Sequence, residues 1–284
     1  MAFALQYEKC PGVNGPPFAC FSCIATDGKD LTGLWRPVRS IRARIIIPHK
    51  SLPLMNASLQ VLSVPKAGHT DAENEDAAAY KAESWPLHAA VADGATESAF
   101  SRTWAQLLVE RSLAEGILAP TETALTAWRT AWRTAVDPKV QAQPWYVAAK
   151  TEQGAHATYL HLQCTANGDW QAARVGDCVL FHIRNRTLQA TWPDMEAGSF
   201  NHRPDLVSTQ PGHAPTVHTT CGTWQPGDAF LLATDAAAAW LLQTGAAPAL
   251  EWTPDAFRDA AQAARTQGTL RNDDTTVLRF VLSS

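Results

Sequence analysis

Carboxylates recur in this chain at the points where apolar runs begin or end. Four segments share the pattern: ENEDAAAY with Glu75 and Asp76, LHAAVADG with Asp93, FLLATDA with Asp235, and RNDDTTVLRFVL with Asp273 and Asp274. A carboxylate at the end of a strand is held rigidly while its oxygens reach solvent. Several such groups that converge would repel one another unless cations lay between them, and hard divalent ions prefer oxygen ligands. Each residue alone is typical of a turn, a helix cap or a surface charge, whereas the four segments together favour a metal site.

The remaining pattern predicts the elements that would position these carboxylates. Apolar alternation and turn residues predict strands and a hairpin meander, and apolar residues at helical spacing predict helices. We expect strands at 58–64, 87–93, 228–235 and 275–284, helices at 97–116, 121–136, 236–245 and 254–268, a meander over 157–185 with a hairpin turn at 167–169, and a loop over 192–215. Because helices come in pairs and strands in hairpins, the sequence favours an α+β fold with antiparallel sheets and helices outside them.

The order of these motifs resembles the PPM-type metal-dependent protein phosphatases, also called protein phosphatase type 2C, and in particular their bacterial-like members. The resemblance runs from about Ser58 to the C-terminus and rests on NEDA at 74–77, VADG at 91–94, ARVGDCVLF at 173–181, PGDAFLLATDA at 226–236 and DDTTV at 273–277. It implies a four-layer α-β-β-α sandwich, in which two antiparallel sheets are flanked by helices. This agrees with the architecture expected from the element pattern alone.

The resemblance also implies a site and a reaction. Asp93 would bridge two Mg²⁺ or Mn²⁺ ions, with a third ion as an alternative, and would be the central catalytic residue. The other implied metal ligands are the backbone carbonyl of Gly94, the carboxylates of Asp235 and Asp273, and the acidic pair Glu75 and Asp76, which would act directly or through water. Hydroxide formed between the ions would attack the phosphorus of phosphoserine or phosphothreonine in a protein substrate. The implied setting is cytoplasmic signalling, in which the enzyme opposes a serine/threonine kinase.

Three positions depart from the family pattern. Asp71 stands where the family usually has an arginine that holds the substrate phosphate, so Lys66, His69 or another cation would have to take over that role. Ala236 replaces the glycine that usually follows the later aspartate, so the turn there must tolerate a Cβ atom. ATES follows Gly94 where some members place a histidine that acts as a general acid. Asp177, in the GD of the third motif, is expected to lie near the site and to support it.

Composition limits the class of protein. Of the chain's 23 Lys/Arg and 27 Asp/Glu, 7 and 3 fall in residues 1–54, which leaves a net charge of −8 on the rest. An acidic body argues against nucleic acid as the main partner. No apolar run reaches the ~20 residues of a membrane-spanning helix, and the six cysteines are scattered, which favours a reducing compartment. The sequence does not define an oligomeric state.

The first 54 residues differ in character from the rest of the chain. They are rich in turn residues and prolines, so we interpret 1–54 as an irregular extension and 55–284 as the phosphatase domain. A further hypothesis is that Met55 is the natural start of the protein. Cys20 and Cys23 form a C-x-x-C pair, but ligands at zinc-site spacing do not accompany it.

Two other motifs resemble sites of a different kind. DAENEDAAAY lacks the glycine and the final glutamate of a calcium loop, and Cys178 lies in an apolar strand, which is typical of a buried cysteine. The alternative to a protein phosphatase is a catalytically weak or inactive phosphatase-fold module that binds a phosphoprotein or regulator, which Asp71 favours. A metal-dependent hydrolase of small phosphorylated metabolites is a third possibility.

Overall fold

The computed structural model describes residues 56–141, 143–200, 204–212 and 214–283. Contacts divide the chain into two units, residues 1–53 and 54–284, and the described elements belong to the second. The predictions for residues 1–54, including the irregular extension and the Cys20–Cys23 pair, lie outside the described residues. Within the described part, no helix is both long enough and apolar enough to cross a lipid bilayer.

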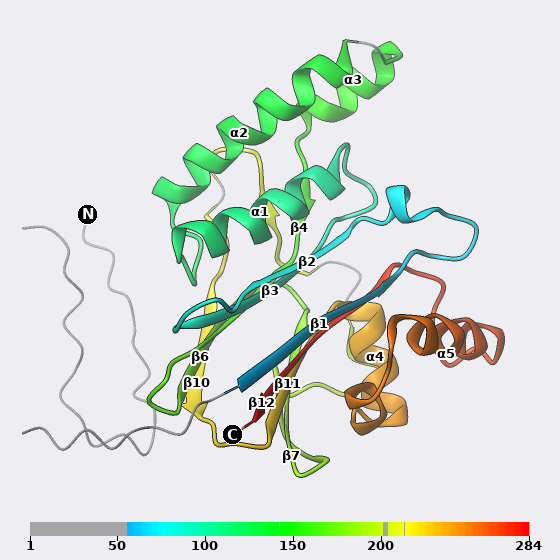
Figure 1. Ribbon diagram of the computed structural model, residues 1–284. Helices are drawn as coiled ribbons and strands as arrows, with labels where there is room; N and C mark the ends of the chain where they lie inside the picture. The colour runs from blue at the N-terminus through cyan, green and yellow to red at the C-terminus, as the bar shows by residue number, and fades with distance from the viewer. Residues whose placement is uncertain (1–55, 142, 201–203, 213, 284) are drawn as a thin grey trace, which may run out of the picture. The chain divides into compact units, whose positions relative to one another are not determined.

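Two five-stranded sheets form the centre of the domain (Figure 1). The first has the order β1 (Asn56–Val64), β12 (Thr275–Ser283), β11 (Asp228–Ala233), β7 (Val179–Arg184) and β8 (Thr187–Trp192). The second has the order β10 (His218–Thr223), β6 (Asp169–Val175), β5 (Tyr159–Cys164), β3 (Leu87–Asp93) and β2 (Asp76–Lys81). A short two-stranded sheet pairs β4 (His156–Ala157) with β9 (Val207–Ser208). The strand pairs named here are antiparallel, as the sequence predicted.

Helices cover the outer face of each sheet (Figure 1). The second sheet carries α1 (Ser101–Glu115), α2 (Glu122–Val140) and α3 (Trp145–Glu152), and the first carries α4 (Asp235–Thr244) and α5 (Pro254–Thr266). Two short 3₁₀ turns, η1 (Asp71–Glu73) and η2 (Ala247–Leu250), lie in the connections. The domain is therefore the α-β-β-α sandwich that the family resemblance implied, with the antiparallel sheets and outer helices that the element pattern predicted.

Three apolar layers hold the sandwich together. Leu160 from one sheet and Phe230 and Phe280 from the other meet between the sheets, and all three are fully buried. Trp128 and Trp132 of α2 join the layer between the helices and the second sheet. A third layer lies between the first sheet and α4 and α5. Because buried aromatic side chains contribute much of the apolar area of a core, these layers fix the sheets and hence the ends of their strands.

Some element boundaries differ from the prediction. The first helix begins at Ser101 and not near Glu97, because Phe100 adopts a left-handed backbone with φ of 57° and so precedes the helix as its cap. The expected strand 228–235 ends at Ala233, and Asp235 is the first residue of α4. The prediction that Asp235 ends a strand was therefore wrong, because the residue begins a helix. Thr234 lies between the two elements as the N-cap residue of that helix.

Candidate metal centre

The predicted acidic residues come together at one end of the sandwich, and each sheet supplies two of them. Asp76 opens β2 and Asp93 closes β3, and the two are direct partners in the antiparallel register. Asp235 starts α4 directly after β11, and Asp273 precedes β12, which neighbours β11 in the first sheet. Asp93 experiences the negative charges of all three of the others, so the four carboxylates share one electrostatic environment.

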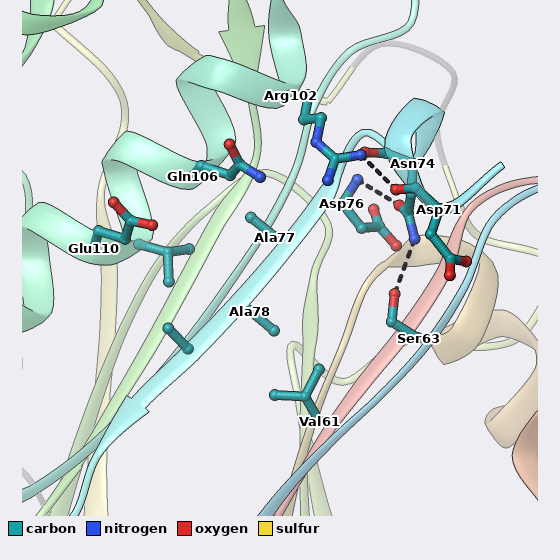
Figure 2. A pocket seen from close by; sticks show the side chains of 12 residues that line it. Val61, Ser63, Asp71, Asn74, Asp76, Ala77, Ala78, Arg102, Gln106 and Glu110 are labelled. Atoms are coloured by element: carbon teal, nitrogen blue, oxygen red, sulfur yellow. Dashed lines mark hydrogen bonds between the residues drawn. The ribbon is translucent and has the colours of Figure 1, made fainter. Parts of the chain in front are cut away.

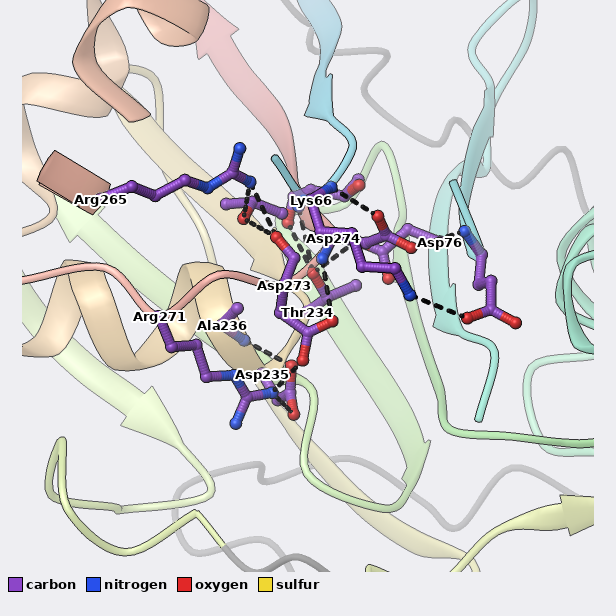
Figure 3. Close-up of polar contacts among 12 residues, drawn as sticks. Lys66, Asp76, Thr234, Asp235, Ala236, Arg265, Arg271, Asp273 and Asp274 are labelled. Atoms are coloured by element: carbon purple, nitrogen blue, oxygen red, sulfur yellow. Dashed lines mark hydrogen bonds and ion pairs between the residues drawn. The ribbon is translucent and has the colours of Figure 1, made fainter. Parts of the chain in front are cut away.

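Hydrogen bonds fix the loops that carry these side chains (Figure 3). The Asp274 carboxylate accepts from the backbone N–H of Lys66 at 2.8 Å and from that of Glu75 at 2.7 Å, so it joins two segments 199 or more residues away in sequence. The Thr234 hydroxyl donates to Asp76 Oδ2 at 2.9 Å across the two sheets. Such contacts position the carboxylates before any ligand binds.

Two glycines allow the backbone to pack closely around the centre. A Cβ atom at Gly94 would lie 2.8 Å from the carbonyl oxygen of Glu75 and 2.9 Å from the backbone of Ser101. Gly176 has a φ of +90°, and a Cβ atom there would lie 2.7 Å from Thr158 Cγ2. Both positions therefore require glycine, for close approach at the first and for backbone conformation as well at the second.

The carboxylates are strained electrostatically. Burial raises the pKa of Asp93 well above its ordinary value, and the charges of Asp76, Asp235 and Asp273 raise it further. The pKa of Asp76 is likewise raised well above its ordinary value, mainly by burial. When the charged form of a carboxylate is disfavoured in this way, an approaching cation stabilises that charged form. The centre is thus an environment in which a divalent ion would be stabilised.

Asp177 belongs to the same cluster. It lies between β6 and β7 and is 7% exposed, and burial together with Asp235 raises its pKa to about 6. Neither of its carboxylate oxygens has a hydrogen-bond partner, and neither does Asp76 Oδ1. Buried polar atoms without partners are rare in folded proteins, so these oxygens indicate a place for a ligand. The sequence placed Asp177 near the site, where Asp235 influences its pKa, and the supporting role that we expected for it stays a prediction.

Glu75 is placed differently from the other predicted ligands. Its Oε1 atom accepts a hydrogen bond of 2.5 Å from the Ser101 hydroxyl, and its Oε2 atom lies 3.6 Å from the Lys66 ammonium. Its backbone carbonyl accepts from the N–H of Gly94 at 3.2 Å. The side chain thus ties the N-terminus of α1 to the loop before β2, and its role as a metal ligand stays a prediction.

Arg271 lies at the edge of the cluster and was not singled out from the sequence. Its Nη2 atom forms ion pairs with Asp235 Oδ2 and, at 3.3 Å, with Asp273 Oδ2 (Figure 3). Burial lowers the pKa of the guanidinium, but the neighbouring Asp235 and Asp273 outweigh it, so the pKa is raised. In this arrangement, no three His, Cys, Asp or Glu side chains of the described residues are placed to hold an ion.

The donor set nevertheless suits hard divalent cations. It consists of carboxylate oxygens from two sheets, several of them buried and unpartnered, with the backbone of Gly94 beside them. Mg²⁺ and Mn²⁺ take oxygen ligands of this kind, whereas zinc sites use mainly cysteine and histidine. The residues therefore fit the type of ion that the resemblance implies.

Two pockets border the cluster, one at Asp76 and one at Asp177. One, of about 310 Å³, lies between β1, β2 and α1 and is lined by Asp76, Asn74, Asp71 and Arg102 (Figure 2). The other, of about 300 Å³, is lined by Asp177, Arg174 and His218. Both volumes are large enough for a phosphoryl group with part of the residue that carries it.

Comparison with known proteins identifies the family. The profile of the family described as protein phosphatase 2C matches residues 65–274, which is most of the chain and spans the acidic positions of the cluster. The chain belongs to the protein phosphatase 2C family.

Solved structures of protein phosphatase 2C relatives share the fold at low sequence identity. The Mycobacterium tuberculosis serine/threonine phosphatase PstP/Ppp is 17% identical, with 80% of this chain and 99% of that chain covered and a TM-score of 0.53. The S. agalactiae serine/threonine phosphatase is 15% identical, with 80% and 99% covered and a TM-score of 0.53. The catalytic domain of PstP in complex with 2 manganese ions is 18% identical, with 81% and 100% covered and a TM-score of 0.50. No curated protein sequence matches the chain.

Family membership supports a phosphatase function, and the solved structures show that the fold is shared. Two of the departures from the protein phosphatase 2C pattern can now be located. Asp71 lies in η1 and is exposed, and its carbonyl oxygen accepts a hydrogen bond of 2.5 Å from Arg102. Ala236 is fully buried as the second residue of α4. Its Cβ atom is tolerated because the chain enters a helix directly after Thr234.

Proposed function

We propose that this chain is a Mg²⁺- or Mn²⁺-dependent serine/threonine protein phosphatase that acts in cytoplasmic signalling against a kinase. The observation that carries the proposal is the cluster of Asp76, Asp93, Asp177, Asp235 and Asp273, in which buried carboxylate oxygens lack partners. Perturbed pKa values concentrated in one acidic cluster are characteristic of functional sites. The protein phosphatase 2C family supports the reaction class.

The residues of the cluster would have different roles in binding the ions. Asp93 and the carbonyl of Gly94 would bind the ions from the second sheet, and Asp235 and Asp273 would bind them from the first. Two ions are proposed, and Asp177 would offer oxygens to a third. The chemistry that bound divalent ions would supply here is a hydroxide nucleophile from water near neutral pH.

The chain's own residues orient the reaction. Asp76 accepts a hydrogen bond from the Thr234 hydroxyl, and its N–H donates to Asn74 Oδ1 at 2.9 Å, while its Oδ1 atom has no hydrogen-bond partner. Asp274 holds Lys66 and Glu75 in place through their N–H groups. These contacts limit the movement of the ligands, which reduces the free-energy cost of reaching the transition state.

A direct experiment measures the hydrolysis of an aryl phosphate and of phosphoserine and phosphothreonine peptides with Mn²⁺ or Mg²⁺. We expect turnover that chelator abolishes, and a fall of at least about 100-fold in kcat/KM for Asp93→Ala and for Asp235→Ala, because each removes a proposed metal ligand. Asp255→Ala is the matched control, since its side chain is 93% exposed on α5. Turnover that is unchanged in excess EDTA would contradict the proposal.

One observation favours a second candidate, a module that binds a phosphoprotein without turnover. Asp71 occupies the position of the family's phosphate-binding arginine, and an acidic residue there repels a phosphate dianion. Phosphopeptide binding with no hydrolysis under any metal would support this candidate. A comparison of turnover on phosphopeptides and on sugar phosphates in the same assay would distinguish a protein substrate from a small metabolite.

A further inference from the structure

Arg271 is placed where a phosphate-binding residue would be needed. It lies in the connection between α5 and β12, two residues before Asp273, and its side chain is 39% exposed. Its guanidinium contacts Asp235 and Asp273 at the same time, so its charged end lies at the edge of the proposed metal centre and also reaches solvent (Figure 3). Among the described residues, Arg271 is the basic residue that forms ion pairs with Asp235 and Asp273.

Three other basic side chains near the centre contact neighbouring loops. Arg265 donates to the carbonyl oxygens of Pro65 at 2.9 Å and Asp273 at 2.7 Å. Arg102 donates to the carbonyl oxygens of Asp71 and Asn74, the latter at 3.0 Å. The Lys66 ammonium lies 3.6 Å from Glu75 and is only 16% exposed. These contacts stabilise the loops around the centre.

We propose that Arg271 binds the phosphoryl group of the substrate, in place of the arginine that Asp71 replaces. The inference rests on the proposed phosphatase function. Divalent ions held by Asp235 and Asp273 would compete for the carboxylate oxygens that Arg271 contacts, which would free the N–H donors of the guanidinium. A guanidinium presents these donors in a planar fork that matches two oxygens of a phosphate, and it keeps its charge at all relevant pH values.

Charge explains why one arginine matters at this position. The five clustered aspartates would repel a phosphate dianion, and two divalent ions offset most but not all of their negative charge. Arg271 would supply the remaining positive charge. It would do so from the rim of the cluster, where a substrate arriving from solvent first meets the site.

The test uses the full chain loaded with Mn²⁺ and measures the binding of inorganic phosphate by calorimetry, together with kcat and KM for an aryl phosphate. Arg271→Gln should weaken phosphate binding by about 10- to 100-fold, since a hydrogen bond to a charged group contributes on the order of 1.5–3 kcal/mol. KM should rise by a similar factor. Arg271→Lys keeps the positive charge but lacks the planar fork of donors, so its affinity for phosphate should lie between those of the parent and Arg271→Gln. Arg186→Gln, which removes an exposed arginine paired with Glu251 near the β7–β8 turn, is the control and should bind phosphate like the parent.

A separate Mn²⁺ titration without phosphate distinguishes this role from metal retention. Arg271→Gln should bind Mn²⁺ at least as tightly as the parent, because a competing cation has been removed. Phosphate binding within twofold of the parent, or a loss that only accompanies weaker Mn²⁺ binding, would overturn the inference. If the parent binds phosphate through Arg271 but hydrolyses no phosphate ester, the proposed function fails while the role of Arg271 stands.

Discussion

The two ends of β11 show two ways of burying an aspartate. Asp228 begins the strand and has a side chain with 0% exposure. It accepts from Arg184 Nε at 2.6 Å and Nη2 at 2.8 Å, from His182 Nε2 at 2.9 Å and from the Gln225 N–H at 3.0 Å. Although burial acts to raise the pKa of Asp228, these hydrogen bonds outweigh it, and the pKa is lowered.

The cluster at the other end of β11 lacks such compensation. Burial and neighbouring charges raise the pKa of Asp76, Asp93 and Asp177, and oxygens of Asp76 and Asp177 are unpartnered. The protein therefore supplies enough hydrogen-bond donors to the buried carboxylate of Asp228. At the proposed metal centre, oxygens of Asp76 and Asp177 receive no such donors. A carboxylate that the fold balances internally stabilises the structure, whereas one that it leaves unbalanced is available to a ligand.

The largest effect on stability is expected at Asp228. Asp228→Asn keeps the shape of the side chain but leaves the positive charge of Arg184 without its partner. Removing one member of a buried pair costs roughly 3–5 kcal/mol, and we expect a value near the lower limit because the Arg184 side chain is 30% exposed and can partly reach water. Chemical denaturation at pH 7 measures the change in the free energy of unfolding.

The control for this prediction is Glu251→Gln. Glu251 pairs with Arg186 at the surface, where the two side chains are 68% and 59% exposed, so its loss should cost less than about 1 kcal/mol. If Asp228→Asn proved no more destabilising than Glu251→Gln, the distinction between the two ends of β11 would lose its basis.

A second effect, of opposite sign and at most similar size, is expected at Asp177 in the presence of chelator. Its pKa is about 6 in the folded protein and near 3.8 when unfolded, so between these values the folded state binds more protons. The free energy of unfolding therefore falls as pH rises through this window. Asp177→Asn removes the penalty and should gain up to roughly 3 kcal/mol above pH 6, with no gain below about pH 4. Asp228 acts in the opposite direction, because its lowered pKa gives stability that is lost as pH falls.

Denaturation curves of the parent and of Asp177→Asn, collected in EDTA from about pH 4 to about pH 8, check this prediction. A difference in unfolding free energy that stays constant with pH would show that Asp177 does not carry the penalty. The same curves with Mn²⁺ should show a smaller advantage for the variant, since bound ions stabilise the charged carboxylates of the parent.

Much of the fold could be read from the sequence because its central strands are buried. Leu87–Asp93 was predicted with the same bounds as the structure shows, since its apolar run ends at a clear turn. The edge strands β8 and β10 were missed, because their residues are largely exposed and lack apolar alternation. The strand β2 was missed for another reason: its alanines have high helix propensity, which pairing with β3 overrides.

The site was less accessible to sequence reasoning than the fold. Carboxylates at the ends of apolar runs could be found from their position, and the structure brings Asp76, Asp93, Asp235 and Asp273 together. The contact of Arg271 with Asp235 joins residues 36 positions apart, and the sequence offered only a basic residue beside an acidic pair. Whether the Asp177 oxygens find hydrogen-bond partners depends on residues that are distant in sequence, and no local pattern encodes those contacts.

The smallest effect is expected at Ala236, where the chain departs from the family's glycine. Because Ala236 is buried in the first turn of α4, Ala236→Gly removes a packed methyl group and adds backbone freedom to the unfolded state. Together these should lower the free energy of unfolding by about 1 kcal/mol and leave kcat/KM for an aryl phosphate unchanged. Thermal unfolding and steady-state kinetics of the same preparation measure both quantities. A clear rise in kcat/KM would instead mean that the Cβ atom restricts Asp235, so that the direct entry into α4 limits the metal centre.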